Sequence, residues 1–242
     1  RDLHSFPTRR SSDLWQRMGP AAQVLDIHRG DKMNILVSMD NKPVNTPEYL
    51  IKKRDVNPDS AYAFANGQNT MTMIRTEKGK TIHIQHDVSS PRPYTRMYMV
   101  NGTRGFANKY PVEGYALESE ALETDGEGIP DHENLNAHSY VPKEVKQALM
   151  EKYKHRIHRE LEEQAKEVGG HGGMDFIMDY RLVYCLRNGL PLDMDVYDLA
   201  EWCCLAELSR ISINNNNAPV AIPDFTRGNW DKIKGFRHAF AD

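Results

Sequence analysis

A histidine framed by four glycines is the feature of this sequence whose residue types most directly suggest chemistry. The run GGHGG covers residues 169–173. Glycine lets the backbone approach a ligand closely, at a cost in conformational entropy, and a histidine held in such a loop can move protons near neutral pH. The run therefore indicates either an active-site position for His171 or a flexible lead-in to a helix that carries a surface histidine.

A tyrosine on a proline-stiffened segment is the second candidate. In SSPRPYTR, residues 89–96, Pro91 and Pro93 bracket Arg92 and precede Tyr94. Because proline fixes its own φ, a tyrosine and an arginine beside a sheet would be held in place to recognise a sugar hydroxyl or an anion. The structural alternative is a stiff connection between strands.

A charged run is the third candidate. The stretch LDIHRGDKM, residues 25–33, contains Asp26, His28, Arg29 and Asp31. These side chains could form a polar cluster near a site, but such a run more often marks a helix C-terminus with its salt bridges.

Two further stretches contain metal-ligand residue types. The acidic stretch TDGEGIPDHEN, residues 124–134, weakly resembles a calcium loop. Calcium takes six or more oxygens, so a solvated insertion is the simpler interpretation. His155 and His158 share a predicted helix with Glu162, where an exposed helix face is more typical than a metal cluster. We expect no metal site.

Sequence motifs for several other chemistries are absent. The chain has no nucleophile elbow, phosphate-cradling loop, H-E-x-x-H or C-x-x-C pair. The dinucleotide fingerprint G-x-G-x-x-G is absent too. The GGHGG run is no substitute for it, because no predicted strand precedes that run.

Composition is typical of a soluble globular domain. The net charge of -3 over 242 residues gives no basic field for nucleic acid, and no apolar run approaches the roughly 20 residues of a membrane helix. We therefore expect neither nucleic acid nor a membrane as a partner. Cys185, Cys203 and Cys204 fall within helical patterns, and this odd number indicates buried thiols rather than a disulfide framework or a zinc site. The compartment stays open.

The candidate residues lie in a chain whose first half predicts mainly strands and whose second half predicts helices. Residues 18–40 predict a short helix, a turn at Gly30-Asp31 and a strand. Two hairpins follow, turning at residues 77–80 and at Asn101-Gly102. With a strand expected within residues 111–117, they predict an antiparallel meander with one buried face and one polar face. Residues 41–68 are polar, contain three prolines and predict a long irregular loop.

The second half of the chain predicts helices. We expect them over residues 142–168, over about 174–187, and from a cap at Asp193 or Asp195 to about residue 213. Residues 218–225, APVAIPDF, add a last short strand. An open antiparallel β-sheet with helices packed on one face is an α+β fold.

The N-terminal stretch DLHSFPTRRSSDL, residues 2–14, has no sustained apolar period. Arg9 and Arg10 suggest a twin-arginine export signal, but no apolar segment follows them. The composition would suit a disordered basic tail. All thirteen residues also fit the in-frame translation of a common short-read sequencing adapter. We therefore expect residues 1–14 to be a non-native tail and the natural protein to begin near Trp15 or Met18.

Several motifs resemble known families. From Gly169 on, GGHGGMDFIMDYRLVYCLRNGLPLDMDVYDLAEWCCLAELS, APVAIPDF and TRGNW resemble the C-terminal part of a glucose-fructose oxidoreductase-like (Gfo/Idh/MocA) protein. The closer resemblance, carried by GPAAQVLDIHRGDKM, GKTIHIQHDVSSPRPYTRMYMVNGTRGFANKYPVEGYALE and GGHGGMDF, is to glycoside hydrolase family 109, the NAD-dependent α-N-acetylgalactosaminidases. It spans about residues 18–235, and the acidic stretch after Glu118 fits it least.

The resemblance implies two domains in the complete protein. One is an N-terminal Rossmann domain that holds NAD. The other is a C-terminal α+β domain that closes the substrate site, to which residues 15–242 would correspond, with the Rossmann domain missing. Within the matching motifs it implies that Tyr94 contacts substrate and that His171 takes a catalytic position. It assigns no cofactor-binding residue to this chain.

The resemblance also implies an unusual hydrolysis. NAD+ takes a hydride from the sugar C3, the ketone acidifies the proton at C2, the glycosidic oxygen leaves by elimination, water adds and the hydride returns. The paired carboxylates of ordinary glycosidases are not needed. Family members carry a Tyr-Pro-Thr-His segment just before the GPAAQ stretch. Asp13 to Gln16 stand there in this chain, so the acid–base groups of that segment are not assigned to it.

Two other functions remain open. The first is an NAD(P)-dependent sugar oxidoreductase of the wider superfamily, which would transfer hydride without elimination. The second is a non-enzymatic oligomerisation or carbohydrate-binding module, because a polar sheet face could pair with a second copy. We expect a carbohydrate partner and leave homo-oligomerisation through the sheet, the sugar and the anomer open.

We expect this polypeptide alone to be inactive and to show no specific binding of NAD, because the chemistry depends on the cofactor and its positioning. Isothermal titration calorimetry with NAD measures this directly. Micromolar affinity would contradict the assignment of the cofactor to another domain.

Overall fold

The computed structural model describes residues 18–63, 67–87 and 89–232. These residues form two compact units. Unit 1 holds the described residues up to Arg92 and from Leu192 onward, and unit 2 holds Pro93–Pro191. The expectation of a non-native tail over residues 1–14 lies outside the described residues.

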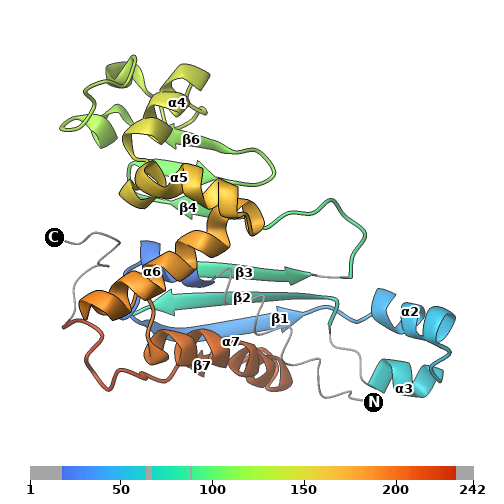
Figure 1. Ribbon diagram of the computed structural model, residues 1–242. Helices are drawn as coiled ribbons and strands as arrows, with labels where there is room; N and C mark the ends of the chain where they lie inside the picture. Colours follow the sequence, from blue (N-terminus) through green and yellow to red (C-terminus); the bar gives the residue numbers. More distant parts are fainter. Residues whose placement is uncertain (1–17, 64–66, 88, 233–242) are drawn as a thin grey trace. The chain divides into compact units, whose positions relative to one another are not determined.

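Unit 1 is built on a four-stranded antiparallel sheet of order β3-β2-β1-β7. A helix over residues 18–24 precedes it, and helix α7 lies against β1 and covers one face (Figure 1). The remaining bounds are β1 Met33–Asp40, α2 Asn45–Arg54, α3 Pro58–Ala63, β2 Asn69–Thr76, β3 Thr81–Asp87, α7 Val196–Asn214 and β7 Val220–Ala221.

Local signals explain these elements. Gly79 has φ +83° in the turn between β2 and β3, a conformation that glycine adopts without a steric penalty. Asp195 caps the start of α7 and accepts hydrogen bonds from the backbone N–H groups of Tyr197 and Asp198. The Asp198 carboxylate in turn accepts one from the Asp195 backbone N–H. This capping box satisfies otherwise unpaired donors of the first turn. The predicted hairpin, the Asp195 cap and the last strand are confirmed.

The core of unit 1 lies between the sheet and α7. It includes the fully buried residues Leu36, Ile74 and Leu205. A polar seam runs beside them: the Ser38 hydroxyl lies 2.7 Å from that of Thr72, and Ser212 Oγ accepts the Ser38 backbone N–H at 2.9 Å. Each buried hydroxyl thus has a partner, which offsets its loss of water.

Buried charges tie the chain before β1 to α7. His28 Nε2 lies 2.6 Å from Glu201 Oε2, and Arg29 Nη2 lies 2.9 Å from Asp198 Oδ2. All four residues are at least 90% buried. Burial opposes protonation of His28, but hydrogen bonds to Asp198 and Glu201 and their negative charges overcome it and raise the pKa of His28 to about 9. Burial raises the pKa of Glu201 as well.

The other face of this sheet differs from the expectation. It was predicted to be polar, yet Val37, Met39, Met71 and Met73 are exposed on it. The register pairs Val37 with Met73 and Met39 with Met71, so the four side chains form one apolar patch. Polar residues flank the patch on β3, where His83 pairs with Met73.

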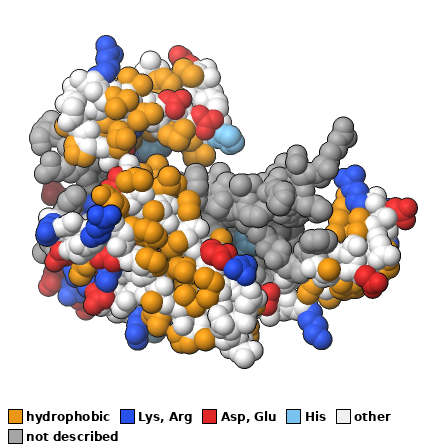
Figure 2. Space-filling model, turned by 90° about the horizontal axis from the view of Figure 1, so that it is seen from below, with side chains coloured by type: hydrophobic (Ala, Val, Ile, Leu, Met, Phe, Trp, Pro, Cys, Tyr) orange, Lys and Arg blue, Asp and Glu red, His pale blue; other side chains and the backbone are white. Residues whose placement is uncertain are grey.

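Residues 41–68 were expected to be irregular, and they contain α2 and α3. Pro47 lies in the first turn of α2 and Pro58 is the first residue of α3. Proline is tolerated there because a first-turn N–H has no partner within the helix. Charged side chains surround these helices, at the right of Figure 2, and Lys52 pairs with Glu48 at 3.0 Å. Two of the three prolines that suggested a loop therefore lie in the first turns of helices.

Unit 2 contains a separate three-stranded antiparallel sheet of order β4-β5-β6. The expected single meander is therefore two sheets, and the second predicted hairpin belongs to the second of them. The bounds are β4 Met99–Asn101, β5 Gly105–Asn108, β6 Gly114–Leu117, the 3-10 helices η2 Ser119–Leu122, η3 His132–Asn134 and η4 His171–Gly173, and the helices α4 Lys143–Lys152, α5 Arg156–Val168 and α6 Met174–Asn188.

The single helix predicted over residues 142–168 is two helices, α4 and α5. The apolar residues Leu149 and Ile157 keep a spacing of four through Tyr153, so periodicity alone does not reveal the break. The break is marked by His155, whose backbone is extended and whose Nδ1 accepts the backbone N–H of Ile157 at 3.2 Å. His155 therefore caps the start of a new helix, α5.

The acidic stretch after Glu118 packs against α4. Leu122 and Ile129 are buried with Leu149, and the Asp125 carboxylate accepts hydrogen bonds from Lys152 Nζ and Tyr153 Oη at 2.8 and 2.7 Å. This insertion therefore contributes to the core of unit 2. Both units combine antiparallel strands with helices, which confirms the α+β fold class. No helix within the described residues is long and apolar enough to span a membrane.

We predict that His28→Gln destabilises unit 1 by about 3–5 kcal/mol at neutral pH, because it leaves two buried carboxylates with one cation. Urea unfolding followed by tryptophan fluorescence measures this. Lys52→Gln, in an exposed pair, is the control and should change the unfolding free energy by less than about 0.5 kcal/mol.

The same variant tests the pH dependence. A folded-state pKa of about 9 above the ordinary 6.5 means that the contribution of His28 is complete below about pH 6.5 and is lost as pH rises through about 9. The stability difference between the two proteins should narrow over that window. A constant difference, or none, would show that His28 does not carry a bound proton in the folded protein.

Candidate functional site

The glycine-framed loop has an unusual backbone. Residues 169–173 all have positive φ, from +69° to +95° for the glycines and +46° for His171. The left-handed region is open to glycine but costs a residue with a β-carbon about 1–3 kcal/mol. Strain of this kind occurs at functional positions, but it also occurs in the structural network of unit 1, where His28 has φ +62°. The backbone is therefore compatible with both interpretations of His171.

The loop also has a structural task, which is to turn the chain from α5 into α6. The backbone N–H of Gly169 donates to the Ala165 carbonyl at 3.0 Å, and that of Gly173 donates to the Gly170 carbonyl at 2.9 Å. A β-carbon at Gly173 would lie 2.9 Å from the Ala165 carbonyl carbon. The glycines thus permit a close approach of the two helices, and the structural and functional interpretations are compatible.

His171 forms an ion pair with Asp175 in the first turn of α6. The His171 Nδ1 lies 2.9 Å from Asp175 Oδ2 and 3.2 Å from Oδ1. The imidazole is 76% exposed. The hydrogen bond that the Asp175 carboxylate accepts, together with its negative charge, raises the pKa of His171. With Nδ1–H donated to the carboxylate, Nε2 can exchange a proton with a ligand.

Tyr94 is exposed in the irregular segment between β3 and β4. Its hydroxyl oxygen accepts a hydrogen bond from Arg96 Nε at 2.6 Å. Its ring meets that of Tyr110 edge to face, with the centroids 6.3 Å apart. Because the guanidinium occupies a lone pair of the oxygen, the phenolic proton can be donated elsewhere. Tyr94 and His171 both belong to unit 2. The resemblance also predicts that both face one open groove.

The charged run 25–33 does not line a site. Its His28 and Arg29 belong to the buried network with α7. Asp31 is fully buried, accepting the Thr76 hydroxyl at 2.9 Å and the Lys78 backbone N–H at 3.1 Å. This run holds the β2–β3 hairpin and α7 in place, which is the salt-bridge interpretation.

The ligand-type side chains on α5 have other partners. Glu162 pairs with Lys154 and with Lys166, and the Lys154 hydrogen bond is the main cause of its lowered pKa. Over the described ranges 18–63, 67–87 and 89–232, no group of three His, Cys, Asp or Glu side chains is arranged to hold a metal ion. Cys185 is buried, and Cys203 and Cys204 are partly buried free thiols.

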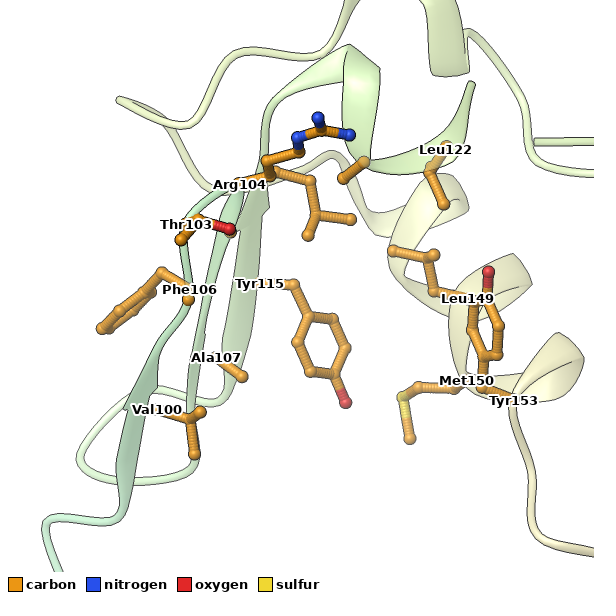
Figure 3. Close-up of a pocket in the computed structure, with 14 residues that line it drawn as sticks. Val100, Thr103, Arg104, Phe106, Ala107, Tyr115, Leu122, Leu149, Met150 and Tyr153 are labelled. Atoms are coloured by element: carbon orange, nitrogen blue, oxygen red, sulfur yellow. The ribbon is translucent and has the colours of Figure 1, made fainter. Parts of the chain in front are cut away.

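A cavity of about 710 Å³ lies between the β4-β5-β6 sheet and α4. Tyr115 points into it from the sheet, Met150 faces it from α4, and Arg104 lies at one end (Figure 3). The cavity adjoins the core that contains Leu122 and Leu149. Neither Tyr94 nor His171 lines it, so it does not belong to the candidate site.

Two partners of the candidate residues, Asp175 and Arg96, were not predicted from the sequence. Asp175 follows His171 by four residues, the spacing at which helical side chains meet, and this spacing is visible in HGGMD. Arg96 follows Tyr94 by two residues within the same motif. The signal for both was their short separation along the chain.

The fold and the site define an α+β domain with an exposed histidine–carboxylate pair on a strained loop. Comparison with known proteins gives the family. The model for "Glycosyl hydrolase 109, C-terminal domain" matches residues 4–232, so the chain belongs to that family. The resemblance inferred from the motifs is confirmed.

Individual relatives agree with this assignment. The chain is 66% identical over 224 residues to "Glycosyl hydrolase family 109 protein 1" of Phocaeicola vulgatus, covering 93% of this chain and 46% of the relative. It is 68% identical over 225 residues to "Glycosyl hydrolase family 109 protein" of Porphyromonas gingivalis, covering 93% and 47%. The chain thus spans about half the length of the curated relatives it matches.

We predict that Asp175→Asn lowers the pKa of His171, because it removes the charge that stabilises the imidazolium. An NMR titration of the imidazole protons measures this, with the His171 signal assigned by its loss in His171→Gln. Asp179→Asn, one turn further along α6, is the matched control and should leave the midpoint close to that of the unmodified chain. An unchanged midpoint in Asp175→Asn would rule out the pair in solution.

Proposed function

We propose that the longer protein to which this chain corresponds is an NAD-dependent glycosidase that cleaves α-N-acetylgalactosaminides, and that this chain is its substrate-binding α+β domain. Membership of a glycosyl hydrolase family supports cleavage of a glycosidic bond. The observation that carries the proposal at the level of residues is the exposed His171–Asp175 pair on a strained loop.

The described residues do not fit NAD. A dinucleotide phosphate binds where a strand leads through glycines into a helix, whereas residues 169–173 join two helices. The Asp175 carboxylate also places negative charge in the first turn of α6, where a phosphate would need positive potential. We therefore assign NAD to another part of the longer protein, where it would supply hydride removal and return on the sugar.

His171 acts in this proposal as the proton donor to the departing glycosidic oxygen. Asp175 raises the fraction of imidazolium near neutral pH and fixes the ring through Nδ1. The proton on Nε2 can then pass to the leaving oxygen as its bond to the sugar breaks. Asp175 is a positioning residue, because it acts through His171.

Tyr94 binds and orients the sugar. The apolar face of its ring can lie against the C–H face of a pyranose, and its hydroxyl can donate to a sugar oxygen. Arg96 occupies the other side of that hydroxyl at 2.6 Å, which fixes the direction of the phenolic proton.

We predict that, in the full-length protein, His171→Ala lowers turnover of an aryl α-N-acetylgalactosaminide on the order of 100-fold or more. Tyr94→Phe should cost about 0.5–1.5 kcal/mol in kcat/KM through one lost hydrogen bond. The assay follows the released phenol and, in parallel, NADH absorbance. His138→Ala, an exposed histidine of unit 2, is the control and should leave both parameters unchanged.

Either of two results would overturn the proposal. Unchanged turnover in His171→Ala would remove the proton donor and return the loop to a purely structural role. Net accumulation of NADH without release of the phenol would identify a sugar oxidoreductase instead.

A further inference from the structure

A second cavity of unit 2, about 840 Å³ in volume, runs along α6 and begins at the glycine loop. Helix α6 lies beside α5, which it follows in the chain (Figure 1). Gly169, Gly170 and Asp175 line the end of this groove. Since Asp175 is the hydrogen-bond partner of His171, the groove starts at the candidate site.

Three aromatic rings follow one another along the groove. Phe176, Tyr180 and Tyr184 are spaced by four residues, which places them on one face of α6. The ring centroids of Phe176 and Tyr180 lie 6.2 Å apart, and those of Tyr180 and Tyr184 lie 6.3 Å apart. The planes of the Tyr180 and Tyr184 rings are within 17° of parallel. All three side chains are partly exposed and line the groove. The buried Arg181 guanidinium lies 5.8 Å from the centroid of the Tyr184 ring. This contact holds the last ring of the row in place.

Polar groups border the aromatic row. Asp175 and Asp179 lie one helical turn apart, and Arg187 lies beyond Tyr184. Two carboxylates at this spacing repel each other. Asp175 is compensated by His171, while Asp179 has no ion pair or hydrogen bond within the part of the chain that the structure describes. Because Asp179 is exposed, its carboxylate is available to accept hydrogen bonds from the hydroxyl groups of a ligand.

We propose that the groove along α6 is a subsite for a neutral glycan, which holds the sugar residues on the leaving side of the bond cleaved at His171. The proposal rests on the proposed function and extends it from the cleaved sugar to the sugars attached to it. Aromatic faces suit the C–H faces of pyranose rings, and carboxylates suit their hydroxyls. The same carboxylates disfavour phosphorylated or nucleic-acid ligands.

The length of the groove indicates more than one sugar. From Phe176 to Tyr184 the helix rises by eight residues, or about 12 Å at 1.5 Å per residue. This exceeds the width of one pyranose ring. The loop end would hold the sugar nearest the cleaved bond, and the Tyr184 end would hold the next.

Direct binding to the 242-residue chain tests the subsite without catalysis. The probes are a neutral trisaccharide ending in α-linked N-acetylgalactosamine and the free monosaccharide, each titrated by calorimetry and by saturation-transfer NMR. We expect the trisaccharide to bind about tenfold more tightly or better, which corresponds to about 1.4 kcal/mol. Equal affinities would overturn the proposal.

Three variants locate the binding. Tyr184→Ala should remove the advantage of the trisaccharide, and Tyr180→Phe, which keeps the ring, should retain it. Met178→Ala is the matched control, since Met178 is 61% exposed on the same helix and does not line the groove. Circular dichroism verifies that each variant is folded. If Tyr184→Ala binds both probes as the unmodified chain does, the subsite is not on α6.

A kinetic comparison separates this proposal from the proposed function. In the full-length protein, Tyr184→Ala should raise KM for the trisaccharide about tenfold with kcat and the aryl glycoside kinetics unchanged. An inactive His171→Ala protein that keeps its trisaccharide preference supports both proposals. Equal KM values for the trisaccharide in the Tyr184→Ala and unmodified proteins, with His171→Ala inactive, would overturn the subsite alone.

Discussion

The arrangement of unit 1 depends on the pairing of two buried carboxylates on α7. Asp198 and Glu201 lie inside the domain, where ionised groups are stable only with partners of opposite charge and good geometry. Their partners, His28 and Arg29, come from the other end of the chain. The α7 helix, the loop before β1 and the sheet between them are therefore fixed as one body. Asp31 extends the same arrangement to the β2–β3 hairpin through Thr76 and Lys78.

Unit 2 uses backbone conformation rather than buried charge to place its candidate residues. The loop 169–173 turns the chain between α5 and α6 and leaves His171 exposed at the start of the second helix. Asp175 is within reach only because α6 begins directly after the loop. The aromatic row begins one residue later, at Phe176. A single turn thus joins the histidine proposed as proton donor, the carboxylate paired with it and the groove proposed for an extended substrate.

Sequence patterns predicted the features that depend on neighbouring residues. The β2–β3 turn at Gly79 and the α7 cap at Asp195 follow from local rules, and both were foreseen. Features whose local signal fits two structures were not. The apolar spacing through Tyr153 continues across the break between α4 and α5, and only the His155 cap marks the boundary. Prolines 47 and 58 suggested a loop, because the same residue breaks a helix interior and begins a helix. His171 was identified from its glycine neighbours, yet its pairing with Asp175 needed the helix boundary at Met174.

The mirror-handed loop has a consequence at the level of the gene. Every single-base change in a glycine codon that alters the residue and keeps the chain intact introduces a β-carbon. At Gly169, Gly170, Gly172 and Gly173 that carbon would enter a left-handed backbone, and at Gly173 it would also meet Ala165. At four of the five codons, such a change would therefore add backbone strain of about 1–3 kcal/mol.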